Sequence, residues 1–199
     1  MNTNLVESTI IPKLKLGSRE ALALLWQDHS KNVLNLAFRM MKDRDQAEDI
    51  LMDVFVQIPK AIHKFRGESA LNTWLYKLTV NACLMKLRAQ KRHSELESEN
   101  ALLIIEEALG QNEGENIDIP GHTQNEAEHY DPELLSQGLN TLPAETRSML
   151  WLKDAEDLDI KDLSEVYNLP EGTIKAKLSR ARHRIKDFIR ERIHHAKQA

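Results

Sequence analysis

The sequence predicts an all-α protein with two small helical domains joined by an acidic linker, the C-terminal domain carrying a helix-turn-helix. Apolar residues recur at i, i+3, i+4 and i+7 over long stretches, and the alternation typical of strands is almost absent. Between the two periodic regions, residues 94–133 lose this spacing and become strongly acidic. With only seven glycines and six prolines, few positions interrupt a helix. We therefore expect domains at 1–93 and 134–199, with the linker between them.

Two helices are expected near the N-terminus, each with a serine at its start. Ser18 can cap the first and Ser30 the second, because a serine hydroxyl can accept a hydrogen bond from an unpaired amide of the first turn. The apolar residues of the first are Leu22, Leu25 and Trp26. Those of the second are Val33, Leu34, Ala37, Phe38 and Met41. Each set predicts one buried face.

The third helix is expected to begin at Asp45, with Glu48 three residues later as in a capping box. Its apolar residues keep helical spacing: Ala47, Ile50, Leu51, Val54, Phe55 and Ile58. Pro59 should kink or interrupt this helix, because its ring removes a donor and clashes with the preceding turn.

A loop at 66–69 and a fourth helix complete the expected N-terminal domain. The helix carries a stripe at helical spacing that should be buried: Leu71, Trp74, Leu75, Leu78, Ala82 and Met85. Periodicity resumes at Leu134, and Thr141 with Pro143 suits another helix start.

The segment 159–189 predicts the helix-turn-helix. A short helix at 160–167 turns Leu163 and Val166 inward, and Asn168 tolerates the left-handed conformation that a tight turn needs. A long helix follows from Glu171 or Gly172. Its apolar stripe is Ile174, Leu178, Ala181, Ile185 and Phe188. Basic residues occupy the rest of this helix, as expected of one that enters the major groove of DNA.

The formal net charge of −4 hides an uneven distribution. The segment 94–133 holds twelve acids and no Lys or Arg, which leaves 19 acids against 27 bases elsewhere, a net charge of +8. Two basic segments, 60–93 and 171–199, lie on either side of the acidic one. This pattern favours a polyanion contacted at two places. Charge alone is equally compatible with solvated helical faces of unlike sign.

Several classes of protein are disfavoured. No apolar run approaches the ~20 residues of a membrane span, and residues 1–16 lack the apolar core of a signal peptide, so no membrane insertion is expected. Cys83 is the only cysteine, which excludes an intramolecular disulfide and a cysteine-based zinc site. We expect a cytoplasmic protein with no cofactor, no metal and no catalytic residue.

Both predicted domains resemble one family. The runs Asp45–Phe55 (DQAEDILMDVF), Phe65–Ser69 (FRGES) and Thr73–Leu78 (TWLYKL) are similar to the second conserved region of bacterial RNA polymerase sigma factors of the small, two-domain, extracytoplasmic-function (ECF) type. Leu142-Pro143, with Arg147 and the run 163–182, is similar to the fourth region. The resemblance covers 21–93 and 134–189. Positions that depart from the usual pattern are Met52, Pro59, Leu71 and Lys177.

The resemblance implies that an acidic face of the third helix binds core RNA polymerase. Its residues are Asp45, Glu48, Asp49 and Asp53. Acids in a first helical turn also stabilise the helix dipole by roughly 0.3–1 kcal/mol each, which is an alternative role for Asp45 and Glu48. Asp53 lies two turns into the helix, so this alternative does not explain it.

The resemblance also implies two DNA-binding sets. The set for the minus-ten element and melting is Lys64, Arg66, Asn72, Trp74, Lys77, Asn81 and Arg88. Within it, the loop before the fourth helix would hold a flipped base, and Trp74 has the alternative of a core role because it lies on the apolar stripe. The set for the minus-thirty-five element is Thr173, Lys175, Lys177 and Arg180.

The expected partners are core RNA polymerase, promoter DNA and an anti-sigma factor. One alternative is a helix-turn-helix regulator that binds an operator without polymerase, but it leaves the block 45–81 without a purpose. Another is a metal-dependent helical enzyme, for which Glu126 and His129 form one Glu-x-x-His pair without the second copy that a di-iron site needs. The acidic linker is either a nucleic-acid mimic inside the polymerase or a soluble spacer.

Overall fold

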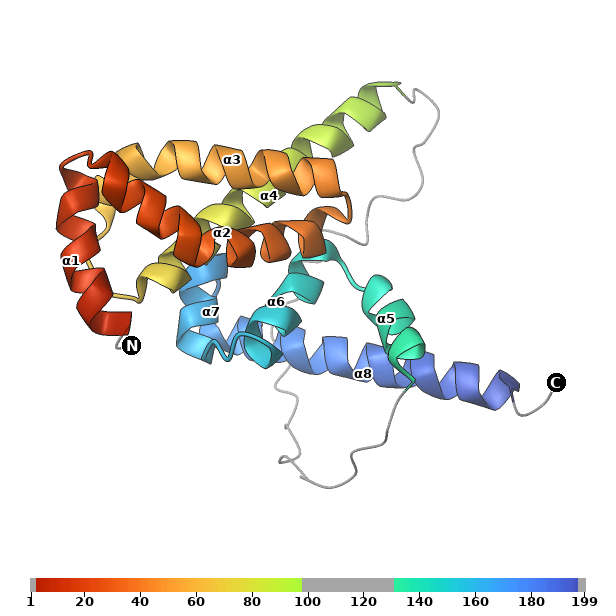
Figure 1. Cartoon of the computed structure of the whole chain (residues 1–199). Helices are drawn as coiled ribbons and strands as arrows, with labels where there is room; N and C mark the ends of the chain where they lie inside the picture. Colours follow the sequence, from red (N-terminus) through yellow and green to blue (C-terminus); the bar gives the residue numbers. More distant parts are fainter. Residues whose placement is uncertain (1–2, 98–130, 197–199) are drawn as a thin grey trace.

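The structure is a computed structural model that describes residues 3–97 and 131–196, and its regular elements there are all helical (Figure 1). The N-terminal helices are α1 (Thr3–Lys15), α2 (Arg19–Met41), α3 (Arg44–Ala61), the short 3-10 helix η1 (Ile62–Lys64) and α4 (Leu71–Glu97). The C-terminal helices are α5 (Pro132–Asn140), α6 (Ala144–Asp154), α7 (Ile160–Tyr167) and α8 (Glu171–Ala196). The all-helical prediction is confirmed.

One of the two predicted serine caps is correct. The Ser18 hydroxyl accepts a hydrogen bond from the amide of Ala21 at 3.2 Å, at the start of α2. The cap predicted at Ser30 is wrong, because α2 continues through this residue as one helix. Buried residues on both sides of Ser30, such as Leu25 and Val33, keep a single helical phase, so continuous packing extends the helix.

The apolar stripe of α3 is buried as predicted, but its cap is not where the sequence placed it. Asp43 caps the helix, its carboxylate accepting the amide of Gln46 at 2.8 Å, whereas Asp45 lies exposed in the first turn. Pro59 does not interrupt α3, which continues to Ala61 before it tightens into η1. The proline lies in the last turn, where it removes only one of the final hydrogen bonds.

The fourth predicted helix is α4, and it is buried along two stripes instead of one. Leu71, Trp74 and Leu75 are buried as expected, but Met85 is 68% exposed, so that part of the prediction is wrong. A second stripe, on an adjacent side of the helix, consists of the buried residues Thr73, Tyr76, Val80 and Cys83. It is buried because α7 packs alongside α4.

The predicted helix-turn-helix is confirmed in detail. Asp159 caps α7, accepting the amide of Asp162 at 2.7 Å, and Asn168 adopts the left-handed conformation with φ 53° and ψ 45°. Along α8 the apolar stripe is buried from Ile174 to Ile185, and Phe188 is half-buried. Pro143 precedes α6 as predicted, while Thr141 belongs to the end of α5.

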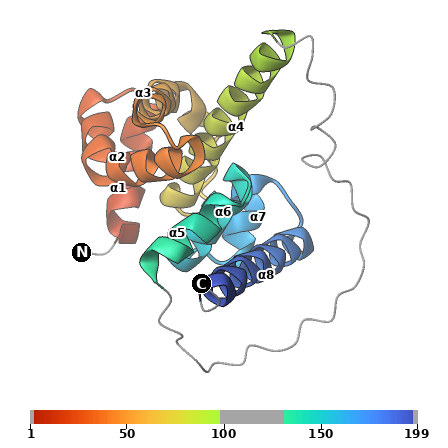
Figure 2. The same ribbon diagram turned by 90° about the vertical axis from the view of Figure 1, so that its right-hand side faces the viewer.

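The two groups of helices pack directly on each other. Helix α7 lies along α4, and α6 lies against α2, so the C-terminal helices cover one side of the N-terminal ones (Figures 1 and 2). The helix α4 extends to Glu97, beyond the predicted domain limit at residue 93. Most of the acidic segment, including Glu126 and His129, lies outside the described residues.

Within residues 3–97 and 131–196, no helix is long and apolar enough to cross a membrane. In the same part of the chain, no group of three or more His, Cys, Asp or Glu side chains is arranged to hold a metal ion.

Candidate polymerase and nucleic-acid interfaces

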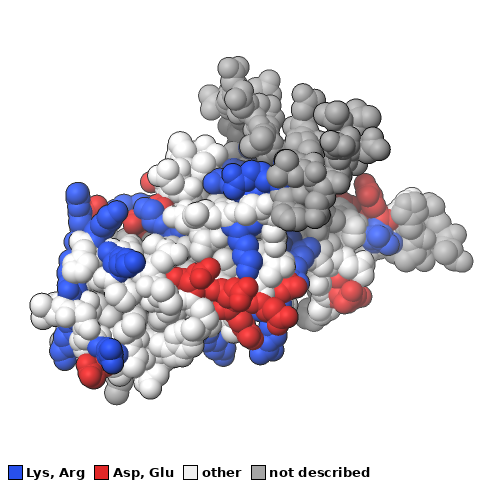
Figure 3. All heavy atoms as spheres, turned by 90° about the horizontal axis from the view of Figure 1, so that it is seen from above, with Lys and Arg blue, Asp and Glu red and all other residues white. Residues whose placement is uncertain are grey.

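The four predicted polymerase-binding acids, Asp45, Glu48, Asp49 and Asp53, are all exposed on α3, and we call them the α3 acidic face. Glu48 accepts a hydrogen bond from Arg44, and Asp49 one from Lys86 of α4, each at 2.9 Å. Figure 3 looks down on the side of the molecule that carries α3, and acidic side chains gather in the middle of this view. The structure therefore brings this set together on one accessible surface.

The same surface contains apolar residues that the sequence analysis did not select. Met52, Val56 and Met85 are 55%, 70% and 68% exposed. Met52 and Met85 line a shallow groove between α3 and α4 together with Asp49, Asp53 and Lys86 among others. Met52 and Val56 are four residues apart on the outer side of α3, out of phase with its buried stripe. Their position in the sequence therefore could have predicted that these two apolar residues are exposed.

The minus-ten set is divided between exposed and covered positions. Lys64, Arg66, Asn81 and Arg88 are exposed, with Arg66 only 3.9 Å from Glu68 in a weak surface pair. Trp74 is 8% exposed, and its ring packs against Phe65 with ring centroids 5.4 Å apart. This burial supports the core role that was the alternative for Trp74.

Asn72 and Lys77 are also partly covered. The Asn72 side-chain oxygen is buried and has no hydrogen-bond partner, which is costly for a polar atom. The Lys77 ammonium group lies 3.9 Å from a carboxylate oxygen of Glu165 in α7. Of the covered residues in this set, Lys77 is the one that contacts a C-terminal helix.

The minus-thirty-five set lies on the first turns of α8. Lys175 and Arg180 are exposed, and Thr173 is half-buried. Lys177 instead points back to α6, where it lies 3.3 Å from Glu145. Lys175 and Arg180 are thus the residues of this set that are most available to DNA.

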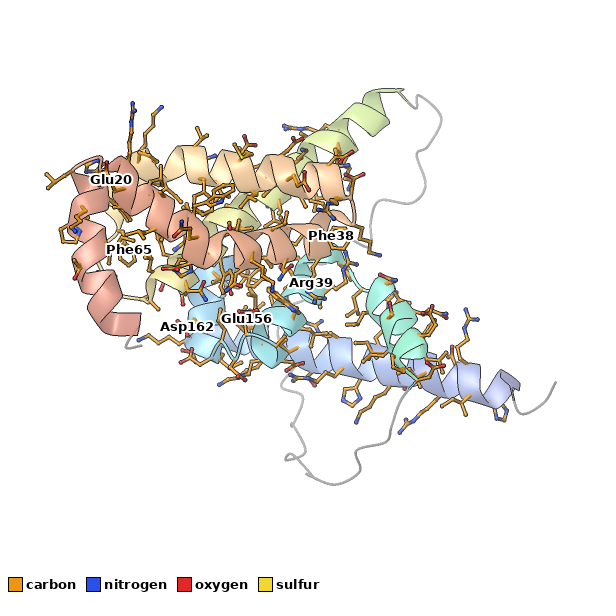
Figure 4. The ribbon with its side chains drawn as sticks, in the orientation of Figure 1. Glu20, Phe38, Arg39, Phe65, Glu156 and Asp162 are labelled. Carbon is orange, nitrogen blue, oxygen red and sulfur yellow. The ribbon has the colours of Figure 1, made fainter. Side chains whose placement is uncertain are left out.

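Carboxylates of the C-terminal domain meet the N-terminal domain along what we call the domain seam. Its residues are Ser69, Thr73, Tyr76 and Lys77 on one side, and Glu156, just after α6, with Asp162 and Glu165 of α7 on the other. Ser69 and Thr73 donate to Glu165 and Asp162 at 3.1 and 3.3 Å, and Tyr76 donates to Glu156 at 2.6 Å. Figure 4 labels Glu156 and Asp162 at this seam.

Burial is the main electrostatic cost at the seam. Desolvation raises the pKa of the Asp162 carboxyl, and the neighbouring Asp159 acts in the same direction. Burial, followed by the hydrogen bond to Glu156, raises the pKa of the Tyr76 hydroxyl. These acids are not among the site residues predicted from the sequence. The available signal was their density, since residues 154–165 hold six acids and one lysine within a DNA-binding motif.

Comparison with known families matches both domains. The family model for sigma-70 region 2 matches residues 25–93, and a model for sigma-70 region 4 matches residues 133–185. The matched segments contain all the residues of the three predicted sets.

Relatives are similar over nearly the whole chain. The chain is 28% identical to an ECF RNA polymerase sigma-E factor of Haemophilus influenzae over 95% of its length and 98% of that protein. It is 28% identical to the RNA polymerase sigma-H factor of Pseudomonas aeruginosa over 93% of its length and 94% of that protein.

Two solved structures share the fold. The sigma factor RpoE of Bartonella quintana, in complex with the anti-sigma factor NepR, matches with a TM-score of 0.58 and 21% identity over 84% of this chain and 96% of that one. CnrH, in complex with the cytosolic domain of CnrY, matches with a TM-score of 0.62 and 13% identity over 94% and 98%. With both conserved regions present in order, the chain belongs to the sigma-70 family and is an ECF-type RNA polymerase sigma factor.

Proposed function

We propose that this sigma factor binds core RNA polymerase through α3, contacts the minus-ten element through α4 and the loop before it, and contacts the minus-thirty-five element through α8. The observation that carries the proposal is the separation of charge on one folded chain. The α3 acidic face is exposed on one side, while the exposed cations of α8 belong to another domain.

The polymerase contact combines charge with apolar area. Asp53 cannot be assigned to helix capping, because Asp43 already caps α3 and Asp53 lies more than two turns further on. Exposed Met52 and Met85 beside it supply unbranched, adaptable side chains of the kind common at binding surfaces. A basic partner surface with apolar pockets is complementary to this groove, and the charges would speed association.

The minus-ten contact uses the loop around Gly67, whose φ of 76° favours glycine, and the start of α4. Opening a base pair costs a few kcal/mol, so the protein must offer a pocket and cations when the base leaves the stack. Lys64 and Arg66 lie exposed at this loop, and Asn81 and Arg88 continue along α4 as contacts for the backbone.

The minus-thirty-five contact follows from the orientation of α8. Its first turns expose Lys175 and Arg180 to solvent, and its amides at the N-terminus favour phosphate. Lys177 is held by Glu145 and would reach DNA only after it leaves that pair.

The proposed regulation is by an anti-sigma factor in the cytoplasm. A structurally similar sigma factor was solved with its anti-sigma factor NepR bound. The chain's own contribution is binding and promoter opening, with phosphoryl transfer left to the polymerase.

The test is run-off transcription with purified core polymerase on genomic fragments that include the region upstream of the gene. Discrete transcripts should require the protein and should disappear with the double variant K175A/R180A. The matched control is K13A/K31A, which removes two exposed lysines from α1 and α2 and should leave the transcripts intact. Sequence-specific duplex binding without core binding or transcripts would instead establish the free-standing regulator.

A further inference from the structure

The domain seam lies on the surface that the proposed function assigns to the minus-ten element. Three donors at the loop and the start of α4 each face a carboxylate of α7: Ser69 and Lys77 face Glu165, and Thr73 faces Asp162. Hydroxyl and ammonium donors of this kind also bind DNA phosphates. The carboxylates therefore occupy donors that promoter DNA would use.

Burial along α4 shows how closely the seam is packed. Thr73, Tyr76, Val80 and Cys83 are spaced at i, i+3, i+7 and i+10 and are between 0 and 3% exposed. This spacing puts them on one face of α4, the face that α7 covers. A nucleic-acid strand cannot reach this face while α7 is in place.

A second row of contacts holds α6 against α2. The guanidinium of Arg39 stacks over the Trp151 ring, 4.8 Å from its centroid, and Arg147 donates to the carbonyl of Arg39 at 2.9 Å. Figure 4 shows Arg39 at this junction, in line with Glu156 and Asp162. Most of the named contacts are polar, which is typical of interfaces that open and close.

The charge of the segment that leads into α7 and includes its first turns is unexpected next to DNA. Residues 154–165 hold six acids and one lysine, and such a surface repels phosphate. In the structure two of these acids, Asp162 and Glu165, are turned toward α4, while Lys175 and Arg180 of α8 remain exposed. Asp162 and Glu165 thus make their contacts with Thr73, Ser69 and Lys77 only when the domains are together.

We infer that the α7 carboxylates Asp162 and Glu165 act as an internal substitute for promoter DNA, closing the free protein and blocking the part of its minus-ten surface that Ser69, Thr73 and Lys77 form. This inference rests on the proposed function for the identity of the blocked surface. The closed form leaves the α3 acidic face and the exposed end of α8 available, so polymerase can bind before the seam opens. Opening would then be coupled to promoter binding.

The only cysteine of the chain provides a direct measure of closure. Cys83 is fully buried on the seam face of α4. Helix α7 packs along α4, and Tyr167 of α7 is also buried, so Cys83 is shielded from solvent while the two helices are in contact. Reaction of Cys83 with N-ethylmaleimide, an uncharged reagent, should therefore require the seam to open.

The experiment uses the full chain and two variants of the seam. Glu165→Lys places a cation opposite Lys77 and removes the acceptor of Ser69, and Tyr76→Phe removes the hydrogen bond to Glu156 without a charge change. Both should raise the Cys83 reaction rate, Glu165→Lys by about tenfold or more, since it removes a charge-assisted hydrogen bond and adds repulsion. Both should also strengthen binding of a fluorescent, mixed-sequence single-stranded DNA, measured by anisotropy.

The matched control is Glu191→Lys, the same charge change at an exposed site of α8 away from the seam. It should leave the Cys83 rate unchanged, and its effect on DNA binding gives the contribution of charge alone. Carbodiimide should also couple Lys77 to Glu165 in the unmodified protein, as detected by mass spectrometry. Circular dichroism confirms that each variant is folded.

Two results would overturn the inference. A Cys83 that reacts rapidly in the unmodified protein, with no Lys77–Glu165 crosslink, would show that the seam is open in solution. Faster labelling of both variants without tighter DNA binding than the charge control would show that the seam closes but masks nothing. These measurements need no polymerase, so failure here is distinguishable from failure of the transcription test.

Discussion

The hydroxyl of Tyr76 donates a 2.6 Å hydrogen bond to Glu156, joining residues 80 positions apart in the sequence. Tyr76 is fully buried in the N-terminal domain, while Glu156 follows α6 in the C-terminal one. The Tyr76 ring also meets Trp151 edge-on, with centroids 6.5 Å apart. One side chain thus links the core of the sigma region 2 domain to the region 4 domain.

Tyr76→Phe should lower the free energy of unfolding. A hydrogen bond to a charged group contributes about 1.5–3 kcal/mol, and the carboxylate left behind can regain water because Glu156 is only half-buried, so we expect a loss of about 1 kcal/mol. Urea unfolding measures it. In Glu156→Ala the same Tyr76→Phe change should cost much less. Equal losses in both backgrounds would show that the bond contributes nothing.

Capping and polymerase binding should separate at Asp43 and Asp45. Asp43→Ala removes the cap of α3 and should reduce stability by about 1 kcal/mol, while its effect on core binding should be small. Asp45→Ala removes an exposed acid that does not cap the helix, so stability should change little and core affinity should fall. Urea unfolding and pull-down on core polymerase measure the two effects. If instead Asp45→Ala lowered stability and Asp43→Ala did not, Asp45 would be the residue that caps α3, as predicted from the sequence.

Local patterns predicted most helices because the burial of each helix follows its own periodicity. The α3 stripe and the α7–turn–α8 unit, including the left-handed Asn168, needed only neighbouring residues. The exposure of Met85 and the burial of Tyr76 could not be predicted this way. The burial of Tyr76 depends on α7 lying beside α4, a contact between residues such as Thr73 and Asp162 that are 89 positions apart, whereas Met85 lies in the open groove between α3 and α4.

The candidate sites also differ in whether local patterns or packing between domains determine them. The α3 acidic face and the exposed cations of α8 follow from which side of an amphipathic helix faces solvent. The covered state of Asn72 and Lys77 does not, since Glu165 reaches Lys77 only through the packing of two domains. Their roles in DNA binding stay predictions.

Asp53→Lys should weaken binding to core polymerase. Because Asp53 does not cap α3, a loss of helix capping cannot account for this effect. The variant reverses an exposed charge in the α3 groove beside Met52, so it should lose attraction to a basic partner and gain repulsion, together at least about tenfold in affinity. Asp28→Lys, at an exposed acid of α2, is the matched control and should bind normally. A higher salt concentration should reduce the difference in affinity for core polymerase between the two variants, because salt screens exposed charges. Equal affinity of both would remove Asp53 from the interface.

Cys83 should make stability fall at high pH. Burial raises the pKa of this thiol to about 12 from its ordinary value of 9.0, so between these values the folded state holds a proton that the unfolded state releases. The stabilisation is complete below pH 9 and is lost as the pH rises toward 12. At pH 10 the loss is about 1.4 kcal/mol relative to pH 8.

Lysines and tyrosines titrate in the same range, so the measurement is the difference in the free energy of urea unfolding between the unmodified protein and Cys83→Ala. That difference should shrink as the pH rises from 8 to 10, because only the unmodified protein bears this cost. A difference that stays constant over this range would mean that the thiol titrates normally and that the seam face of α4 is accessible to water.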